Sequence, residues 1–192
     1  MNFLAHLFLS GDNEEIMVGN VLADRIRGKK INDFSEGIQK GIRLHRIIDS
    51  YTDTHPVVEL SKQRLRRDFG HYAPVIADVF YDHFLAANWN EYSDVPLKTF
   101  AEKSYHALKK YRMLFSGGFQ FAFVYMRFRN LLVSYSTYKG VHFALERMSG
   151  RAKNSSNLTD AVDELKKNYS LYKKEFSSFF PQLAEHVRKC PL

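Results

Sequence analysis

Apolar positions recur every three or four residues along most of the chain, which is the spacing of one face of an α-helix. No pair of segments combines alternating polarity with the turn residues of a β-hairpin. No internal repeat or long linker divides the chain. The pattern therefore predicts an all-α protein, a single-domain helical bundle over residues 1–192. Helices are expected near residues 2–10, 12–27, 36–54, 56–70, 73–92, 96–117, 119–138, 140–149, 158–178 and 181–189.

Local signals predict where several of these helices begin. Asp12, followed by an acidic residue three positions later, indicates a capped start. Ser35 can cap the helix that follows it. Pro56 suits the first turn of a helix, and Pro181 is expected to open the last one. The polar segment GRAKNSSN at 150–157 is typical of an exposed loop.

The composition is close to that of an average globular protein. Of 192 residues, 45% are hydrophobic and 26% are charged, which excludes a fibrous repeat and a wholly disordered chain. The single cysteine, Cys190, excludes an internal disulfide and fits a reducing compartment. No window has the ~18 apolar residues of a membrane span, and the first residues lack the basic region of a signal peptide. A cytoplasmic location is therefore expected.

Charge is distributed unevenly along the chain. Residues 1–96 carry 11 basic and 14 acidic residues, whereas residues 97–192 carry 17 basic and 7 acidic ones. The basic half is either an ordinary solvated surface or a docking face for a nucleic acid, an anionic membrane or an acidic protein. Because no signature of a nucleic-acid-binding motif is present, no specific nucleic acid is expected as a partner.

Polar residues interrupt the apolar stripe of the helix predicted at 36–54. Ile38, Ile42, His45 and Asp49 follow helical steps, and Asp53 continues the same line. A carboxylate inside a buried stripe is costly unless it is paired or bound to a cation. His45 and Asp49, one turn apart, could bind one metal ion together. Alternatively, they simply pair with each other.

The helix predicted at 73–92 has a similar interruption. Asp78 and Asp82 are one turn apart, so they repel each other unless a cation or a proton lies between them, and His83 follows directly. Asp24 is another acid in an apolar turn, and His6 lies on the apolar helix FLAHLFL. A lone histidine in such a helix is usually a core residue.

Together these residues could form a metal site. Several carboxylates and imidazoles on four helices suit an oxygen-rich site for Mn²⁺ or Mg²⁺, or a mixed site for iron or zinc. The chain has no E-x-x-H, which argues against a ferritin-like di-iron bundle. It also has no H-E-x-x-H, no P-loop and no G-x-S-x-G. Water activated by a metal, attacking a phosphorus or carbonyl centre, is the chemistry that remains.

Four spaced motifs within residues 1–89 are similar to those of a known family. They read MNFLAHLFLSG, GNVLADRIRG, LHRIIDSYTDTHP and APVIADVFYDHFLAANW. In this order they resemble the acyl carrier protein phosphodiesterase family, also called acyl carrier protein hydrolase. The resemblance implies a divergent, all-α member of the HD-type metal-dependent phosphohydrolases, with an HD-domain-like fold.

The resemblance also implies a reaction. The enzyme would hydrolyse the phosphodiester that links 4′-phosphopantetheine to a serine of holo-acyl carrier protein, giving apo-acyl carrier protein. Mn²⁺ would be the expected cofactor, with Mg²⁺ or Fe²⁺ as alternatives. The acidic carrier protein would be the partner that the basic half attracts.

The resemblance guides the expected roles of the candidate residues. Four side chains are expected to hold or orient the metal: Asp24, His45, Asp49 and Asp82. His6 or His83 is expected to protonate the departing serine oxygen, and Arg46 to contact a phosphate oxygen. Asp53 and Asp78 are expected to orient the ligands. The chain has no adjacent His-Asp pair, so its ligand set departs from the standard HD pattern.

Two other functions fit the same residues. The chain could be an HD-like hydrolase of a nucleotide or another small phosphoester. It could instead be a non-catalytic basic protein that binds nucleic acid or a carrier protein. Turnover of nucleotides would favour the first, and salt-sensitive binding without turnover would favour the second.

Overall fold

The computed structural model describes residues 1–26, 28–149 and 158–192, and within these ranges it contains helices and no strand. The prediction of an all-α fold is confirmed. Short 3₁₀ turns connect several of the helices. The α-helices are α1 (Phe3–Leu9), α2 (Glu14–Leu22), α3 (Glu36–Thr54), α4 (Pro56–Phe69), α5 (Ala73–Ala87), α6 (Leu97–Lys110), α7 (Gly117–Phe128), α8 (Leu131–Ser134), α9 (Tyr138–Ser149), α10 (Ala161–Lys167) and α11 (Tyr169–Lys189).

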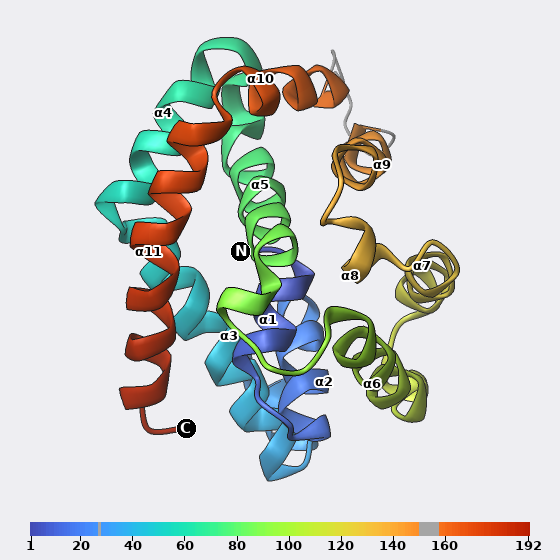
Figure 1. Cartoon of the computed structure of the whole chain (residues 1–192). Coiled ribbons are helices and arrows are strands. Elements are labelled where there is room, and N and C mark those ends of the chain that lie inside the picture. The colour runs from blue at the N-terminus through green and yellow to red at the C-terminus, as the bar shows by residue number, and fades with distance from the viewer. Residues whose placement is uncertain (27, 150–157) are drawn as a thin grey trace.

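Helix α5 runs through the middle of the molecule (Figure 1). Helices α4 and α11 lie together on one side of it, and α6 to α9 lie on the other. The arrangement follows from the apolar character of α5, most of whose residues are buried. Phe80 and Phe84 of α5 contact Tyr172 and Phe176 of α11, with ring centroids 5.1 Å and 5.9 Å apart. Such aromatic pairs anchor the two helices to each other.

Helices α2 and α3 pack unusually closely at two glycines. A Cβ atom on Gly19 would lie 2.1 Å from the carbonyl oxygen of Ile38, and one on Gly41 would lie 2.2 Å from that of Ile16. Only glycine fits at both positions, because any side chain would push the helices apart. The close crossing brings the end of α2 beside the middle of α3, where His45 lies.

The predicted bounds of α3 and α4 are confirmed, but the predicted cap of α2 is wrong. Asn13, not Asp12, caps α2, because its side-chain oxygen accepts hydrogen bonds from the N–H groups of Glu15 and Ile16. Ser35 occupies the N-cap position of α3, as predicted, but its hydroxyl donates to a carboxylate oxygen of Glu15 and makes no capping hydrogen bond. Helix α2 also ends at residue 22 and continues as a 3₁₀ turn, while its predicted end at 27 lies outside the described residues.

Several predicted helices have other bounds. The helix expected at 73–92 ends at Ala87, and the helix expected at 96–117 ends at Lys110. The aromatic helix expected at 119–138 is interrupted at Asn130, whose φ of 46° lies in the left-handed region. The helix expected at 158–178 is interrupted at Asn168, between α10 and α11. Pro181 does not open a new helix but lies inside α11. Because proline has no N–H group, the carbonyl of Ser177, four residues earlier, receives no helical hydrogen bond. Both residues are exposed, so water can bind this carbonyl instead.

The predicted loop at 150–157 lies outside the described residues. Within the part of the chain that is described, no helix has both the length and the apolar character needed to cross a membrane.

Candidate metal centre

Three side chains from two helices meet beside the start of the chain. His6 of α1 and His45 and Asp49 of α3 place their ligand atoms within 4.8 Å of one another. The Nε2 atom of His6 lies 3.2 Å from Oδ1 of Asp49, and the Nε2 atom of His45 lies 2.9 Å from Oδ2 of the same carboxylate. Asp24 adds a second carboxylate, 3.1 Å from Nε2 of His45. These four side chains line a cavity of about 290 Å³.

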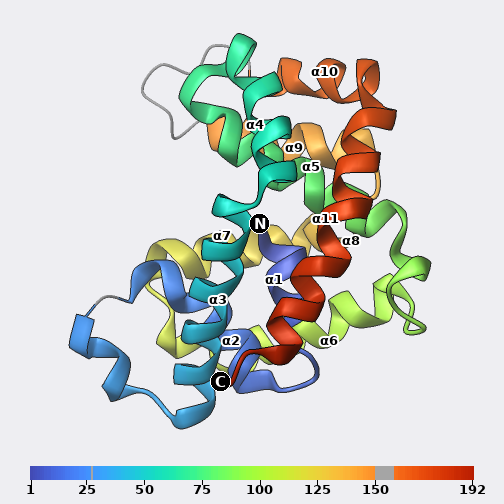
Figure 2. The same ribbon diagram turned by 90° about the vertical axis from the view of Figure 1, so that its left-hand side faces the viewer.

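Helical geometry explains the arrangement. His45 and Asp49 are four residues apart on α3, so they lie on one face of the helix. Asp24 is carried by the 3₁₀ turn that follows α2, and the close crossing of α2 and α3 brings this turn to His45. The imidazole rings of His6 and His45 stack, with centroids 4.3 Å apart and an interplanar angle of 20°. Figure 2 shows α1 beside α3, with the N-terminus at the upper end of α1.

A buried asparagine orients both imidazoles. The Oδ1 atom of Asn20 lies 2.7 Å from Nδ1 of His6 and 3.2 Å from Nδ1 of His45. The amide nitrogen of Asn20 donates to the carbonyl oxygen of His6 and to the hydroxyl of Ser10, each at 2.9 Å. These bonds fix the orientation of the Asn20 amide. If the amide were flipped, its Oδ1 atom would face the carbonyl oxygen of His6, and both atoms are acceptors. Both Nδ1 atoms therefore carry the proton.

This tautomer leaves the Nε2 lone pairs of both rings facing Asp49. Burial lowers the pKa of His6, so its ring stays neutral. Its Nε2 lone pair then faces Oδ1 of Asp49 at 3.2 Å, which sets one acceptor against another. A cation between the two atoms removes the conflict. Imidazoles that bind metals commonly donate their other ring N–H to an oxygen, as both rings do here.

When no cation is bound, protonation of His45 at Nε2 turns its contact with Asp49 into a hydrogen bond. Burial alone would lower the pKa of His45, but the hydrogen bonds to Asp24 and Asp49 raise it to about 9. Burial alone would also raise the pKa of Asp49, but the hydrogen bond from His45 and the other favourable interactions, among them the charge of the Met1 amino group, together outweigh burial and lower this pKa. The hydrogen bond from His45 likewise lowers the pKa of Asp24. The carboxylates of Asp24 and Asp49 therefore both stay charged, and both lie beside Nε2 of His45.

The donor set fits a divalent metal ion. Two imidazole nitrogens and a carboxylate form the combination that binds iron and related transition metals, and the second carboxylate adds an oxygen that suits Mn²⁺. The cavity is partly open, because the side chain of Asp24 is 79% exposed whereas that of His6 is 7% exposed. A small ligand can therefore reach the ligand atoms from one side.

Three of the predicted site residues do not line this cavity: Asp82, His83 and Arg46. Asp82 is fully buried, and its oxygens accept hydrogen bonds from the backbone N–H groups of Leu4 and Ala5, at 2.8 Å and 3.1 Å. It therefore caps the first turn of α1 and does not line the cavity. The Nδ1 atom of His83 lies 2.7 Å from the carbonyl oxygen of Tyr135. The predicted metal role of Asp82 and proton-donor role of His83 do not fit these positions.

The other predicted residues surround the site to different degrees. Asp78 and Asp53 line the cavity, where Asp78 lies 3.1 Å from the amino group of Met1 and Asp53 accepts from Lys62 at 2.8 Å. Neither is hydrogen-bonded to a ligand imidazole. Arg46 is exposed and does not line the cavity. His6, predicted as a proton donor, lies among the candidate ligand atoms together with His45 and Asp49.

Asn20 is the important site residue that the sequence-based analysis missed. It is fully buried in the apolar segment VGNVLA, and an amide in such a position requires partners. Its place four residues before Asp24 is the signal that could have identified it. A polar residue inside an apolar segment is also the signal that identifies Asp24, His45 and Asp49.

Comparison with known proteins agrees with the motifs. The family model described as acyl carrier protein phosphodiesterase matches residues 1–183. The chain belongs to the acyl carrier protein phosphodiesterase family. The prediction of this family, and with it of an enzyme, is confirmed.

Members of this family with similar sequences cover nearly the whole chain. The acyl carrier protein phosphodiesterase of Pectobacterium atrosepticum is 30% identical over 96% of both chains. That of Shigella boydii is 32% identical over 95% of both, and that of an Escherichia coli strain is 31% identical over 98% of both. No solved structure matches the chain.

Proposed function

We propose that the chain is a metal-dependent phosphodiesterase that acts on holo-acyl carrier protein. It hydrolyses the phosphodiester between 4′-phosphopantetheine and serine, and releases apo-acyl carrier protein. Family membership supports the substrate. The observation that carries the metal dependence is the contact between the Nε2 lone pair of His6 and the carboxylate of Asp49, which needs a cation between them.

His6, His45 and Asp49 are the proposed ligands, with Asp24 as the fourth. This ligand set differs from the one expected from the sequence by one residue: it contains His6 and does not contain Asp82. Mn²⁺ is the proposed ion, since the site mixes imidazole nitrogens with carboxylate oxygens. A bound divalent ion supplies Lewis acidity, which offsets the charge of the phosphate and lowers the pKa of water.

The protein prepares the site through fixed hydrogen bonds. Asn20 holds both Nδ1–H groups, so each imidazole keeps one tautomer and one orientation. Burial of His6 keeps its Nε2 atom neutral and available as a ligand. The exposed Asp24 stands at the open side of the cavity, where a phosphodiester on a large protein substrate can approach. Fixed donors of this kind require little reorganisation during the reaction.

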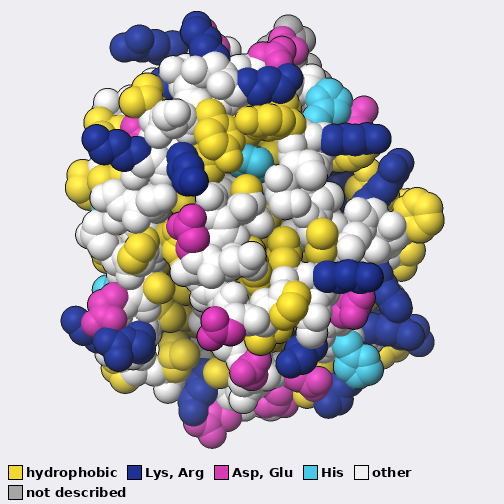
Figure 3. All heavy atoms as spheres, in the orientation of Figure 1, with side chains coloured by type: hydrophobic (Ala, Val, Ile, Leu, Met, Phe, Trp, Pro, Cys, Tyr) yellow, Lys and Arg dark blue, Asp and Glu magenta, His cyan; other side chains and the backbone are white. Residues whose placement is uncertain are grey.

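The basic half of the chain offers a docking surface for an acidic carrier protein. Lys109, Arg112 and Arg127 line a groove at α6 and α7 and have no ion pair within the described residues. Exposed apolar side chains, Met113 and Phe128, lie in the same groove. Figure 3 shows Lys and Arg side chains beside hydrophobic ones over these helices, at the lower right. If this surface docks the substrate, KM rises with ionic strength while kcat changes less.

Mass spectrometry of the carrier protein tests the proposed reaction. Purified protein supplied with Mn²⁺ should convert holo-acyl carrier protein to the apo form, which is lighter by the 4′-phosphopantetheine group. Removal of metal with a chelator should stop the conversion, and Mn²⁺ should restore it. Asp49→Asn should abolish the reaction, whereas Asp53→Asn on the same helix should retain it.

Two results would contradict the proposal. Conversion that is unaffected by chelators would remove the metal from the mechanism. Hydrolysis of nucleotides without conversion of holo-acyl carrier protein would move the activity to another phosphoester. The predicted cytoplasmic location is kept as part of the proposal, because a single cysteine suits a reducing compartment.

A further inference from the structure

One side chain at the metal centre carries a buried donor atom without a partner. Asn2 precedes α1 and lines the same cavity of about 290 Å³ as the proposed ligands. Its Oδ1 atom accepts a hydrogen bond from the N–H group of Phe3 at 2.9 Å, which leaves the Nδ2 atom as the other end of the amide. This Nδ2 atom is buried and has no hydrogen-bond partner within the described residues. An N–H group in such a place costs free energy unless it donates to an acceptor.

Asn2 lies one helical turn before a proposed metal ligand. Its carbonyl oxygen accepts a hydrogen bond from the N–H group of His6 at 3.3 Å, and both residues line the same cavity. The described part of the chain has one other buried side-chain atom without a partner, Nε2 of His83, and that residue does not line the cavity. The unpartnered donor of Asn2 is therefore a feature of the metal centre.

The other side-chain N–H groups of this cavity already have acceptors. The Nδ1–H groups of His6 and His45 donate to the Oδ1 atom of Asn20, and the amide nitrogen of Asn20 donates to the carbonyl oxygen of His6. The backbone N–H groups at the start of α1 are also occupied, because they donate to the side chains of Asn2 and Asp82. Among the described side chains that line the cavity, the amide of Asn2 is thus the N–H donor that remains for a ligand.

The charge of the cavity makes such a donor important for an anion. Four carboxylates line it: Asp24, Asp49, Asp53 and Asp78. A phosphodiester is negatively charged, so these carboxylates repel it except where a cation or an N–H group lies between them. An amide N–H group can bind a phosphate oxygen and, because it has no charge, does not compete with a metal ion for the carboxylates.

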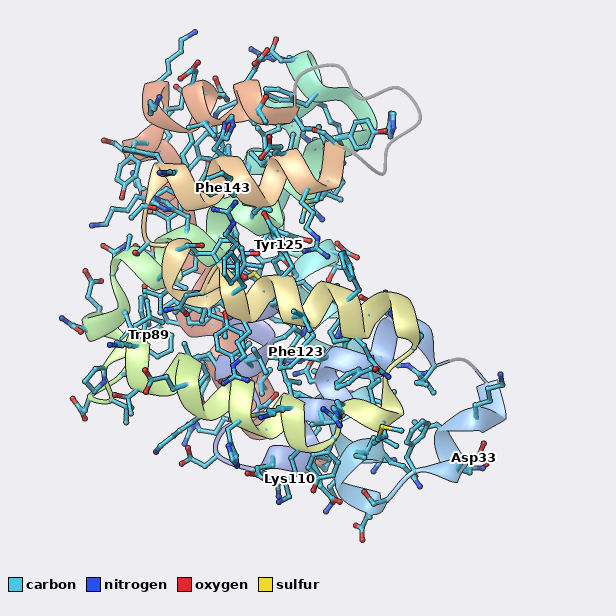
Figure 4. All side chains as sticks on the ribbon, turned by 90° about the vertical axis from the view of Figure 1, so that its right-hand side faces the viewer. Asp33, Trp89, Lys110, Phe123, Tyr125 and Phe143 are labelled. Carbon is cyan, nitrogen blue, oxygen red and sulfur yellow. The ribbon has the colours of Figure 1, made fainter. Side chains whose placement is uncertain are left out.

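The cavity on the other side of Phe3 offers a phosphate fewer polar contacts. It lies between α7 and α9, and most of its lining side chains are apolar or aromatic. Figure 4 shows Tyr125 and Phe143 on the two helices that flank it. The guanidinium of Arg25, which also lines it, donates to the hydroxyl of Ser116 at 3.0 Å. Phosphate oxygens are therefore better satisfied in the polar cavity of the metal centre.

We propose that the Nδ2 group of Asn2 donates a hydrogen bond to a non-bridging oxygen of the phosphate that binds at the metal centre. The inference rests on the proposed function, which places a phosphodiester in this cavity. Asn2 touches the phosphate and not the metal ion, so its role differs from that of His6, His45 and Asp49. The contact with Phe3 holds the amide in place, and a donor that is held in place requires little reorganisation while charge shifts on the phosphate oxygens.

Binding of inorganic phosphate tests this contact separately from hydrolysis. The full chain with Mn²⁺ is titrated with inorganic phosphate by calorimetry. Asn2→Leu removes the donor without adding charge, so phosphate affinity should fall by about 10- to 100-fold, the loss expected for a hydrogen bond to a charged group. The affinity for Mn²⁺ should stay nearly unchanged, which a general distortion of the site would not allow.

Two further variants control for the loss of a helix cap. Asn2→Asp keeps the oxygen that accepts from Phe3 but loses the donor, so it should also bind phosphate weakly, without losing Mn²⁺ affinity. This variant covers the case in which Asn2→Leu does not fold. Asn13→Leu makes the same substitution at the exposed N-cap of α2, outside the cavity, and should bind phosphate as the unaltered chain does.

Three results would overturn the inference. The first is equal phosphate affinity in the unaltered chain and in a folded Asn2 variant, because water would then satisfy the Nδ2 group. The second is a parallel loss of Mn²⁺ and phosphate affinity, which would assign Asn2 to the support of the metal ligands. The third is an unaltered chain that binds no phosphate in the presence of Mn²⁺.

Hydrolysis of holo-acyl carrier protein separates this inference from the proposed function. Phosphate binding that depends on Asn2 supports the contact even if the carrier protein is not hydrolysed, a result that would count against the proposed reaction alone. If Asn2→Leu hydrolyses holo-acyl carrier protein with an unchanged kcat/KM, the reaction stands and the contact is overturned.

Discussion

Helices α3 and α5 both carry an aspartate and a histidine among apolar residues, and the structure gives the two pairs opposite surroundings. On α3, His45 and Asp49 lie one turn apart and face a cavity together with His6. On α5, Asp82 and His83 are adjacent and therefore point in different directions, each to a backbone group. The α3 pair is available to a ligand. On α5, Asp82 is satisfied by backbone N–H groups, whereas Nε2 of His83 is buried without a hydrogen-bond partner among the described residues.

The difference teaches that the partner, and not burial alone, separates a candidate metal ligand from a structural acid. Asp82 is the more deeply buried carboxylate, yet two backbone N–H groups satisfy it. Asp49 is partly exposed and faces the Nε2 atoms of two imidazoles whose other nitrogens are already bonded to Asn20. The lone pair of His6 that faces Asp49 favours a cation between the two, whereas the N–H groups that face Asp82 leave no such need.

The largest expected effect is on metal binding at α3. Asp49→Asn removes the charge between the two imidazoles while the size of the side chain is kept. The affinity for Mn²⁺, measured by calorimetry, should fall by more than about 100-fold, because loss of a ligand exceeds the loss expected from a supporting residue. Asp53→Asn, one turn further along α3, is the control and should bind Mn²⁺ nearly as well as the unaltered chain. Similar affinities in both variants would remove Asp49 from the ligand set.

The corresponding change on α5 should affect stability instead. Asp82→Ala leaves the N–H groups of Leu4 and Ala5 without partners, so the free energy of unfolding should fall by about 2–4 kcal/mol. Urea denaturation measures this loss, and the Mn²⁺ affinity of the folded fraction should change little. Asp68→Ala, at an exposed position, should leave stability unchanged. If Asp82→Ala lost Mn²⁺ affinity but kept its free energy of unfolding, Asp82 would be a metal ligand and not a structural residue.

A smaller effect is expected from the residue that orients the imidazoles. Asn20→Leu removes the oxygen that accepts from both Nδ1–H groups, so Mn²⁺ affinity of the folded protein should fall by about 10- to 100-fold. Asn20→Asp keeps an acceptor oxygen and should lose less affinity than Asn20→Leu. Equal affinities of the unaltered chain and folded Asn20→Leu would show that the tautomers need no such support.

The sequence was sufficient for elements whose signals are local. The bounds of α3 and α4 follow from apolar spacing and from Pro56, and the candidate acids follow from interruptions of apolar stripes. The roles of these acids depend on contacts between distant residues. Asp82 bonds to N–H groups 77 and 78 positions away, and the crossing at Gly19 and Gly41 that brings Asn20 to His45 has no local signature.

The smallest expected effect is a pH dependence that comes from His83. Burial lowers its pKa from the ordinary value of 6.5, although the bond to the Tyr135 carbonyl opposes the shift. The unfolded chain therefore gains a proton below pH 6.5 that the folded chain does not. Stability from this group is present above pH 6.5 and is lost as the pH falls, by at most about 1.4 kcal/mol per pH unit.

Urea denaturation between pH 7.5 and pH 5 isolates this contribution by difference. In His83→Asn the side-chain amide can still donate to the Tyr135 carbonyl but does not titrate, so stability should fall less steeply with decreasing pH than in the unaltered chain. His142→Asn, at an exposed position on α9, should keep the original dependence. Parallel curves for the unaltered chain and His83→Asn would mean that His83 has the same pKa in the folded and the unfolded chain, so that its burial on α5 does not oppose protonation.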